Sequence, residues 1–94
     1  MIAGYNPSPN FSGADVEAAI LAVGRVWKKR GLYFTPALLV NAVHTSLHGC
    51  MRRKNDRAAY ETITRKFRRM KRSNQVRVQE HGDFQGDGQI FKFV

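Results

Sequence analysis

Apolar residues in this chain fall into three stretches in which they recur every three or four positions, with polar residues between them. That spacing places apolar side chains on one face of a helix, so we predict helices over residues 13–30, 36–48 and 57–72. The predicted apolar faces consist of Val16, Ala19, Ile20, Val23 and Trp27, of Leu39, Val40, Val43 and Leu47, and of Ala59, Tyr60, Ile63, Phe67 and Met70. Three such faces can bury one another in a small bundle.

Residues at the ends of these stretches support the same boundaries. A basic turn followed by Gly31 is typical of a helix C-terminus, and Thr35 before a proline is typical of an N-cap. Asn55 or Asp56 is the predicted N-cap of the third helix. Asn74 is expected to end that helix, because asparagine tolerates the left-handed conformation.

The pattern changes to alternation after the third helix. Val76 and Val78 alternate with polar neighbours, and residues 90–94 are rich in β-forming side chains that also alternate. The glycine-rich segment 82–88 between them predicts a β-hairpin whose loop is longer than two residues. Residues 32–34 predict an abbreviated further strand. The expected fold class is therefore α+β, a three-helix bundle followed by a C-terminal β-hairpin.

The 94 residues predict one domain over residues 13–94, preceded by an N-terminal arm over residues 1–12 whose Tyr5 and Phe11 are expected to pack back on it. The longest apolar stretch is far shorter than the roughly 20 residues that cross a bilayer, and the first residues lack the pattern of a signal peptide. Cys50 is the only cysteine, so no internal disulfide can form and a reducing compartment fits. We expect an intracellular protein with no membrane segment.

Positive charge is concentrated in one part of the chain. Residues 52–77 contain 11 of the 16 Lys and Arg residues and only two acidic residues, Asp56 and Glu61, so this window alone has the net charge of +9 that the whole chain has. Such a concentration indicates a polyanionic partner, and nucleic acid fits best. Because the window includes the third predicted helix, the charge lies on a folded element.

The order of elements resembles the winged helix-turn-helix superfamily, whose basic third helix leads into a hairpin. The local resemblance lies in the run Thr62-Ile63-Thr64-Arg65, continued by Phe67 and Met70, and in Val76-Arg77-Val78 after it. Two features depart from the superfamily: the segment 49–55 is longer than the usual turn between helices two and three, and Asn74 stands where glycine is common. The resemblance implies binding of double-stranded DNA, with the third helix in the major groove and the hairpin as a wing.

Residues on the polar face of the third helix are the candidates for contacts with DNA. Near its start, Arg57, Glu61 and Arg65 are candidates for base readout, because arginine pairs with guanine O6 and N7 and glutamate accepts from cytosine N4. Residues further along are more suited to phosphates. The full candidate set is Arg52, Arg53, Lys54, Arg57, Glu61, Thr62, Arg65, Lys66, Arg68, Arg69, Arg72 and Arg77. The simpler alternative is a solvated basic face with no partner.

These observations favour a small sequence-specific DNA-binding protein that acts as a transcription regulator. RNA binding is an alternative, although we expect no aromatic stacking patch on a sheet face. A second alternative is a small interaction or inhibitor protein whose basic face binds an acidic protein. Leu21 and Leu38 lie off the predicted apolar faces, and two such residues can belong to a partner surface. We therefore leave open whether the protein forms a homodimer.

Chemistry of other kinds has little support in the sequence. His44 and His48 are spaced one helical turn apart on the predicted polar side of their helix, with Cys50 close by, but a fourth zinc ligand is missing. Asp83 and Asp87 lack the further acids of a calcium loop. No phosphate-binding loop or nucleophile motif occurs, so we expect no enzyme, no metal and no cofactor.

Overall fold

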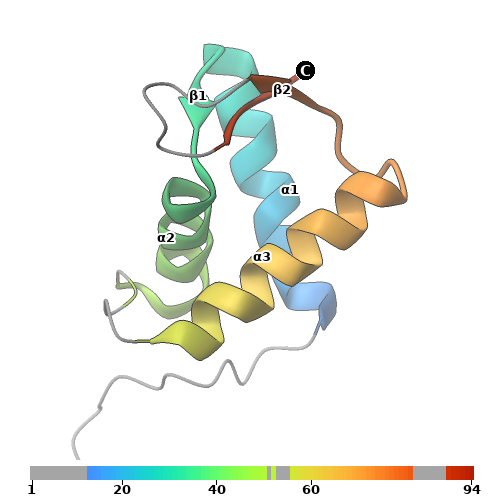
Figure 1. Ribbon diagram of the computed structural model, residues 1–94. Coiled ribbons are helices and arrows are strands. Elements are labelled where there is room, and N and C mark those ends of the chain that lie inside the picture. The colour runs from blue at the N-terminus through green and yellow to red at the C-terminus, as the bar shows by residue number, and fades with distance from the viewer. Residues whose placement is uncertain (1–12, 51, 53–55, 82–88) are drawn as a thin grey trace, which may run out of the picture.

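The structure is a computed structural model that describes residues 13–50, 52, 56–81 and 89–94. Its elements are α1 (Gly13–Arg30), β1 (Tyr33–Phe34), α2 (Pro36–His48), α3 (Arg57–Arg72), β2 (Val78–His81) and β3 (Ile90–Phe93). The three predicted helices are confirmed with the predicted bounds. The α+β class is also confirmed: three helices are followed by a hairpin, in a winged-helix-like layout (Figure 1).

Local hydrogen bonds explain where the helices begin and end. Thr35 Oγ1 accepts from the backbone N–H of Leu38 at 3.3 Å, which caps α2. Asp56, not its neighbour Asn55, caps α3: its Oδ1 accepts from the N–H of Ala59 at 3.1 Å. Asn74 follows α3 with a φ of 63°, the left-handed conformation predicted for it.

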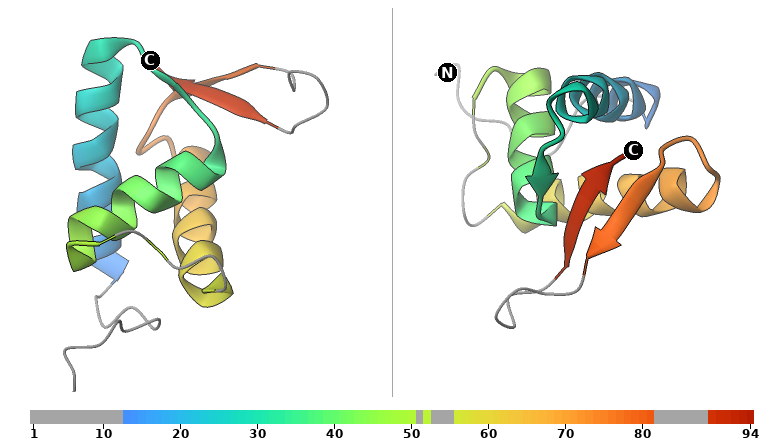
Figure 2. Two further views of the ribbon diagram at one scale, coloured as in Figure 1. Left: turned by 90° about the vertical axis from the view of Figure 1, so that its left-hand side faces the viewer. Right: turned by 90° about the horizontal axis from the view of Figure 1, so that it is seen from above.

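The three strands form one antiparallel sheet in the order β1-β3-β2. The predicted hairpin is confirmed, although β2 begins at Val78, two residues later than Val76. The abbreviated strand β1 lies on the other side of β3, where Phe34 pairs with Phe91. Figure 2 shows the sheet across one end of the helices, with one face turned toward them. The sheet therefore closes the bundle.

An aromatic cluster joins the sheet to the helices. Phe34 of β1 stacks on Phe93 of β3, with ring centroids 4.8 Å apart, and lies 5.7 Å from Phe91. Phe67 of α3 meets the rings of Phe34 and Phe91 edge to face, at 6.1 and 5.6 Å. Trp27 of α1 packs against Phe34 at 5.1 Å. Because these five rings come from four elements, they hold α1, α3 and the sheet together.

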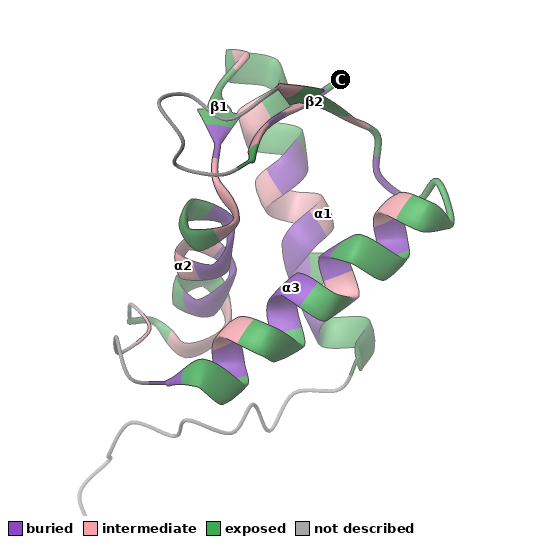
Figure 3. Ribbon diagram, viewed as in Figure 1, coloured by how far each residue is buried: buried purple, intermediate pink, exposed green. Residues whose placement is uncertain are grey.

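The predicted apolar faces are buried against one another, as Figure 3 shows in purple for the fully buried residues. Four predicted core residues lie at the margin of the core and are only partly buried: Val23, Trp27, Leu47 and Tyr60. Leu21 also packs against the core, although it lies off the predicted face of α1. Leu21 lines a groove together with Phe93 and Val94 at the C-terminal end of β3, so its neighbours come from a distant part of the chain.

Two polar residues are more buried than their helical positions suggest. His44, predicted on the polar side of α2, is only 1 % exposed, and that prediction was wrong. α2 packs against both α1 and α3. The chain after α2 passes close to His44, whose Nδ1 lies 2.7 Å from the carbonyl oxygen of Cys50. Thr64, at the edge of the basic face, is also buried, and its hydroxyl is satisfied within α3 because it donates to the carbonyl of Tyr60 at 2.8 Å.

Several predictions fall outside the described residues. These concern the arm over residues 1–12, the candidate DNA-contacting residues Arg53 and Lys54, and the hairpin loop over residues 82–88. Among the residues that the structure describes, no helix is both long and apolar enough to cross a membrane.

Candidate nucleic-acid interface

α3 presents one face to solvent along its whole length. Its exposed residues are Arg57, Ala58, Glu61, Thr62, Arg65, Arg68, Arg69 and Arg72. Figure 3 shows the exposed parts of α3 in green. The opposite face is buried through Ile63, Phe67 and Met70. A helix of 16 residues is about 24 Å long, so the exposed face is a basic strip of that length.

The lysines and the arginines of α3 have different surroundings. Lys66 pairs with Glu17 of α1 at 2.6 Å, and Lys71 pairs with Glu80 of β2 at 3.0 Å. Lys66, a candidate for DNA contact, is therefore half-buried and paired with an acid. Within the described part of the chain, no ion pair involves the five exposed arginines Arg57, Arg65, Arg68, Arg69 and Arg72. The lysines attach α3 to its neighbours, whereas the arginines remain available to a partner.

Glu17 is the acidic group that fixes the α1 side of this strip. Its Oε2 accepts from Lys66, and its Oε1 accepts from Gln75 Nε2 at 3.2 Å. The hydrogen bond and charge of Lys66 lower the pKa of Glu17 below its ordinary value, with smaller contributions from Gln75 and Arg69. Glu17 is therefore ionised at neutral pH and holds Lys66 against α1.

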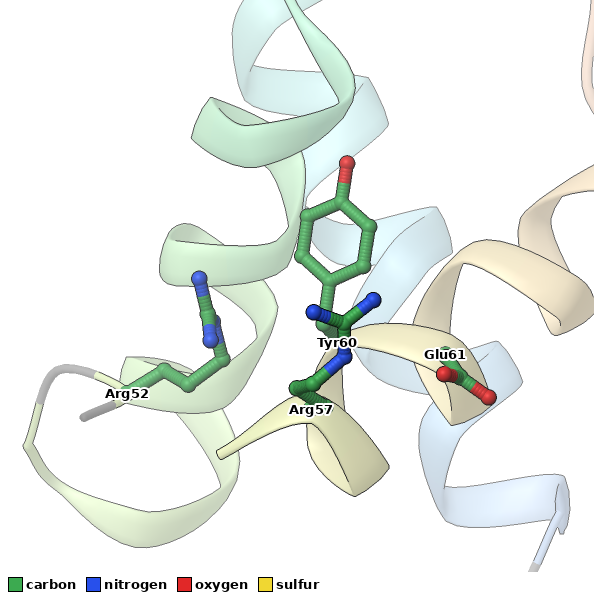
Figure 4. Close-up of a pocket in the computed structure, with 4 residues that line it drawn as sticks. All are labelled: Arg52, Arg57, Tyr60 and Glu61. Atoms are coloured by element: carbon green, nitrogen blue, oxygen red, sulfur yellow. The ribbon is translucent and has the colours of Figure 1, made fainter. Parts of the chain in front are cut away.

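The start of α3 borders a cavity of about 290 Å³ lined by Arg52, Arg57, Tyr60 and Glu61 (Figure 4). The guanidinium of Arg52 lies over the Tyr60 ring, 5.1 Å from its centroid, and its Nη1 donates to the carbonyl of Asp56 at 3.0 Å. Arg52 is thus held by the domain itself. Arg57 and Glu61 lie on successive turns at the exposed side of the cavity, where a ligand can reach both.

A second cavity, of about 220 Å³, lies between the start of α1 and the middle of α3. It is lined by Gly13, Val16, Thr62, Arg65, Lys66 and Arg69. Because Arg65 and Arg69 line this cavity, they lie on the side of the strip that faces α1. Because Lys66 is paired with Glu17, the cations that remain there are Arg65 and Arg69. Two guanidinium groups beside the Thr62 hydroxyl suit an anionic oxygen, such as that of a phosphate.

Arg77, the last of the candidate DNA-contacting residues, lines a groove that is separate from the strip of α3. It is exposed, as expected between the buried Val76 and the half-buried Val78. The structure places it with Arg25 and Lys28 of α1 along a groove of about 140 Å³, and no residue of α3 lines that groove. Arg77 therefore belongs to a second cationic group on the α1 side of the molecule.

The sheet carries an exposed tyrosine on its outer face, where the sequence predicted no aromatic stacking patch. Tyr33 is 56 % exposed, whereas its neighbour Phe34 is 2 % exposed. His81 of β2 meets the Tyr33 ring edge to face at 5.0 Å. The sequence signal for this face was weak, because a strand of two residues is too short to show alternation.

The two histidines of α2 lie against each other. The rings of His44 and His48 stack with centroids 4.3 Å apart, and burial, followed by the nearby His44, lowers the pKa of His48. Cys50, the third proposed ligand, is exposed. Over the described ranges, no three or more His, Cys, Asp or Glu side chains are grouped so that they can hold a metal ion.

The α2–α3 connection is long, as predicted, since α2 ends at His48 and α3 begins at Arg57. It does not prevent α2 and α3 from packing against each other, and the basic strip of α3 remains exposed. The arrangement of three helices and a small antiparallel sheet is compatible with a winged helix. Comparisons with protein families, curated proteins and solved structures gave no match for this chain.

Proposed function

We propose that this protein binds double-stranded DNA in a sequence-specific way and acts as a transcription regulator inside the cell. In this proposal α3 lies in the major groove and the β2–β3 hairpin is a wing beside it. One observation carries the proposal: five arginines occupy one exposed face of a rigid helix, and none of them pairs with an acid within the described residues. The major groove of B-DNA is wide enough to admit such a helix.

The order of residues along α3 supports a division of roles. Arg57 and Glu61 lie near its start, the part that usually meets base edges, and Arg65 follows one turn later. The planar guanidinium of arginine donates two parallel hydrogen bonds to guanine from two separate nitrogens, a geometry that the single ammonium of lysine lacks. Arg68, Arg69 and Arg72 lie toward the end of the helix and suit phosphates. The cavity beside α1 adds a competing role for Arg65, as a phosphate ligand together with Arg69.

Duplex binding with single arginine variants tests the proposal. A preferred site is first selected from random duplexes, and its affinity is then compared with that of a random duplex. Arg57→Ala and Arg65→Ala should each reduce discrimination by about 1–3 kcal/mol, because each removes a bidentate base contact. Arg72→Ala should weaken both duplexes about equally and reduce the salt slope by about 1. All three residues are exposed, so an unchanged melting temperature is the control.

The salt dependence of duplex binding tests the contact with the backbone directly. Neutralisation of about six phosphates predicts a slope of log affinity against log salt near −5. A slope shallower than about −2 would exclude a backbone-contacting strip. If duplex DNA is not bound and structured RNA is, the RNA alternative replaces the proposal. If neither is bound, an acidic protein partner becomes the better explanation of the strip.

A further inference from the structure

The outer face of the sheet is a second exposed surface with its own chemistry. Strand pairing aligns Tyr33 with Lys92, Lys92 with Gln79, and Ile90 with His81. Side chains of paired residues lie on the same face, and alternation places Phe34, Phe91 and Phe93 on the other face, where they are buried. We name the five residues Tyr33, Gln79, His81, Ile90 and Lys92 the outer sheet face. Figure 2 (right) looks onto it, and no helix crosses in front of the strands.

Contacts within the outer sheet face fix the Tyr33 ring and leave it accessible. Lys92 Nζ lies 5.3 Å from the centroid of the Tyr33 ring, and His81 meets the ring edge to face at 5.0 Å. Tyr33 is nevertheless 56 % exposed. An aromatic ring that is held by its neighbours loses little conformational freedom when a flat ligand stacks on it.

The charged side chains that the structure describes around the outer sheet face are positive. Lys92 lies at its centre, and the last turn of α1 contains the exposed basic residues Lys29 and Arg30. This turn leads into Gly31, where an added Cβ would lie 3.9 Å from Lys92 Cε. The nearest acid among the described strand residues, Glu80, points to the helix side, where it pairs with Lys71. An anionic ligand therefore meets no described carboxylate on this face.

We propose that the outer sheet face binds single-stranded DNA, with an unpaired base stacked on Tyr33 and the adjoining phosphates beside Lys92 and the basic end of α1. A ring for stacking within a cationic surface is the combination that holds single strands. A duplex hides the faces of its bases and cannot use Tyr33 in this way. The choice of DNA over RNA rests on the proposed function, because α3 then holds duplex DNA on a different side of the same domain.

Oligonucleotide binding with ring-specific variants tests this inference. The probes are a fluorescent oligothymidine of about 12 nucleotides, which covers the usual site sizes, the matching oligouridine, and a duplex of random sequence. Tyr33→Leu should reduce affinity for oligothymidine about five- to 100-fold, because it keeps an apolar side chain but removes stacking. Tyr33→Phe keeps the ring and should leave the affinity nearly unchanged. Because Tyr33 is exposed, neither variant opens a core cavity, and melting temperatures check this.

Amide NMR spectra locate the bound strand independently of any variant. Oligothymidine should shift the amide signals of Tyr33, Gln79 and Lys92. Tyr33→Leu, which lowers the affinity for oligothymidine, should leave the affinity for the duplex unchanged. The inference is overturned if Tyr33→Leu binds oligothymidine as well as the parent, if the shifts are confined to α3, or if oligouridine binds more tightly than oligothymidine. If Tyr33-dependent binding of oligothymidine occurs without any duplex binding, the inference holds and the proposed function fails.

Discussion

Replacing Phe67 by alanine removes the side chain through which α3 packs under the sheet. Phe67 is 3 % exposed. Its ring lies edge to face against Phe34, Phe91 and Phe93, at centroid distances of 6.1, 5.6 and 6.3 Å. Those rings belong to β1 and β3, which are fixed by their own pairing, so they cannot close the space that the substitution leaves.

The expected loss is large relative to the stability of the whole domain. A buried Phe→Ala substitution costs about 3–5 kcal/mol, because it combines lost burial with an unfilled cavity. Alanine is the better helix former by about 0.5 kcal/mol, which offsets a small part. Scaled by length, a protein of 94 residues is stable by about 5–14 kcal/mol. We therefore expect Phe67→Ala to lower the melting temperature by about 15–30 °C.

Urea and thermal unfolding followed by circular dichroism measure this loss. Leu38→Ala is the matched control: Leu38 also lies on a helix but is 53 % exposed, so its truncation should change stability by no more than about 0.5 kcal/mol. Phe67→Leu should fall between the two, because it retains most of the buried volume. If Phe67→Ala melts within a few degrees of the parent while the control behaves as expected, α3 does not pack by this face.

Three further predictions concern positions away from the exposed arginines. Gly24→Ala should destabilise the protein by about 1 kcal/mol despite the better helix propensity of alanine, because the added Cβ would lie 3.2 Å from the tightly packed Phe93 ring. Urea unfolding measures this change, and a more stable variant would show that the ring can move. The pKa of His48 is lowered from 6.5 in the folded protein, so below pH 6.5 the unfolded chain binds a proton at His48 more readily than the folded protein does. The free energy of unfolding should therefore decrease from pH 7.5 to 5.5, and His48→Gln should make this decrease smaller. An unaltered pH profile would contradict this. Glu17→Gln should raise duplex affinity about two- to fivefold by releasing Lys66, as measured by titration at low salt; a weaker complex would show that the pair orients α3.

The helices and their boundaries follow from local sequence patterns. Caps and apolar spacing are properties of neighbouring residues, so Thr35, Asp56 and Asn74 act as they do wherever the rest of the chain lies. The arginine-rich face of α3 was predictable for the same reason. Residues one helical turn apart share a face, and a face rich in charge cannot be the one that is buried.

The tertiary structure decided which surroundings each of these residues has. Spacing along α3 gives the direction in which Lys66 points, but only the packing of α1 places Glu17 opposite it. In the same way, α1 and not α3 lies beside Arg77. Tyr33 is exposed on a sheet because β1 pairs with β3 from the far end of the chain. Such pairings depend on the shape and burial of the whole domain, so no local pattern encodes them.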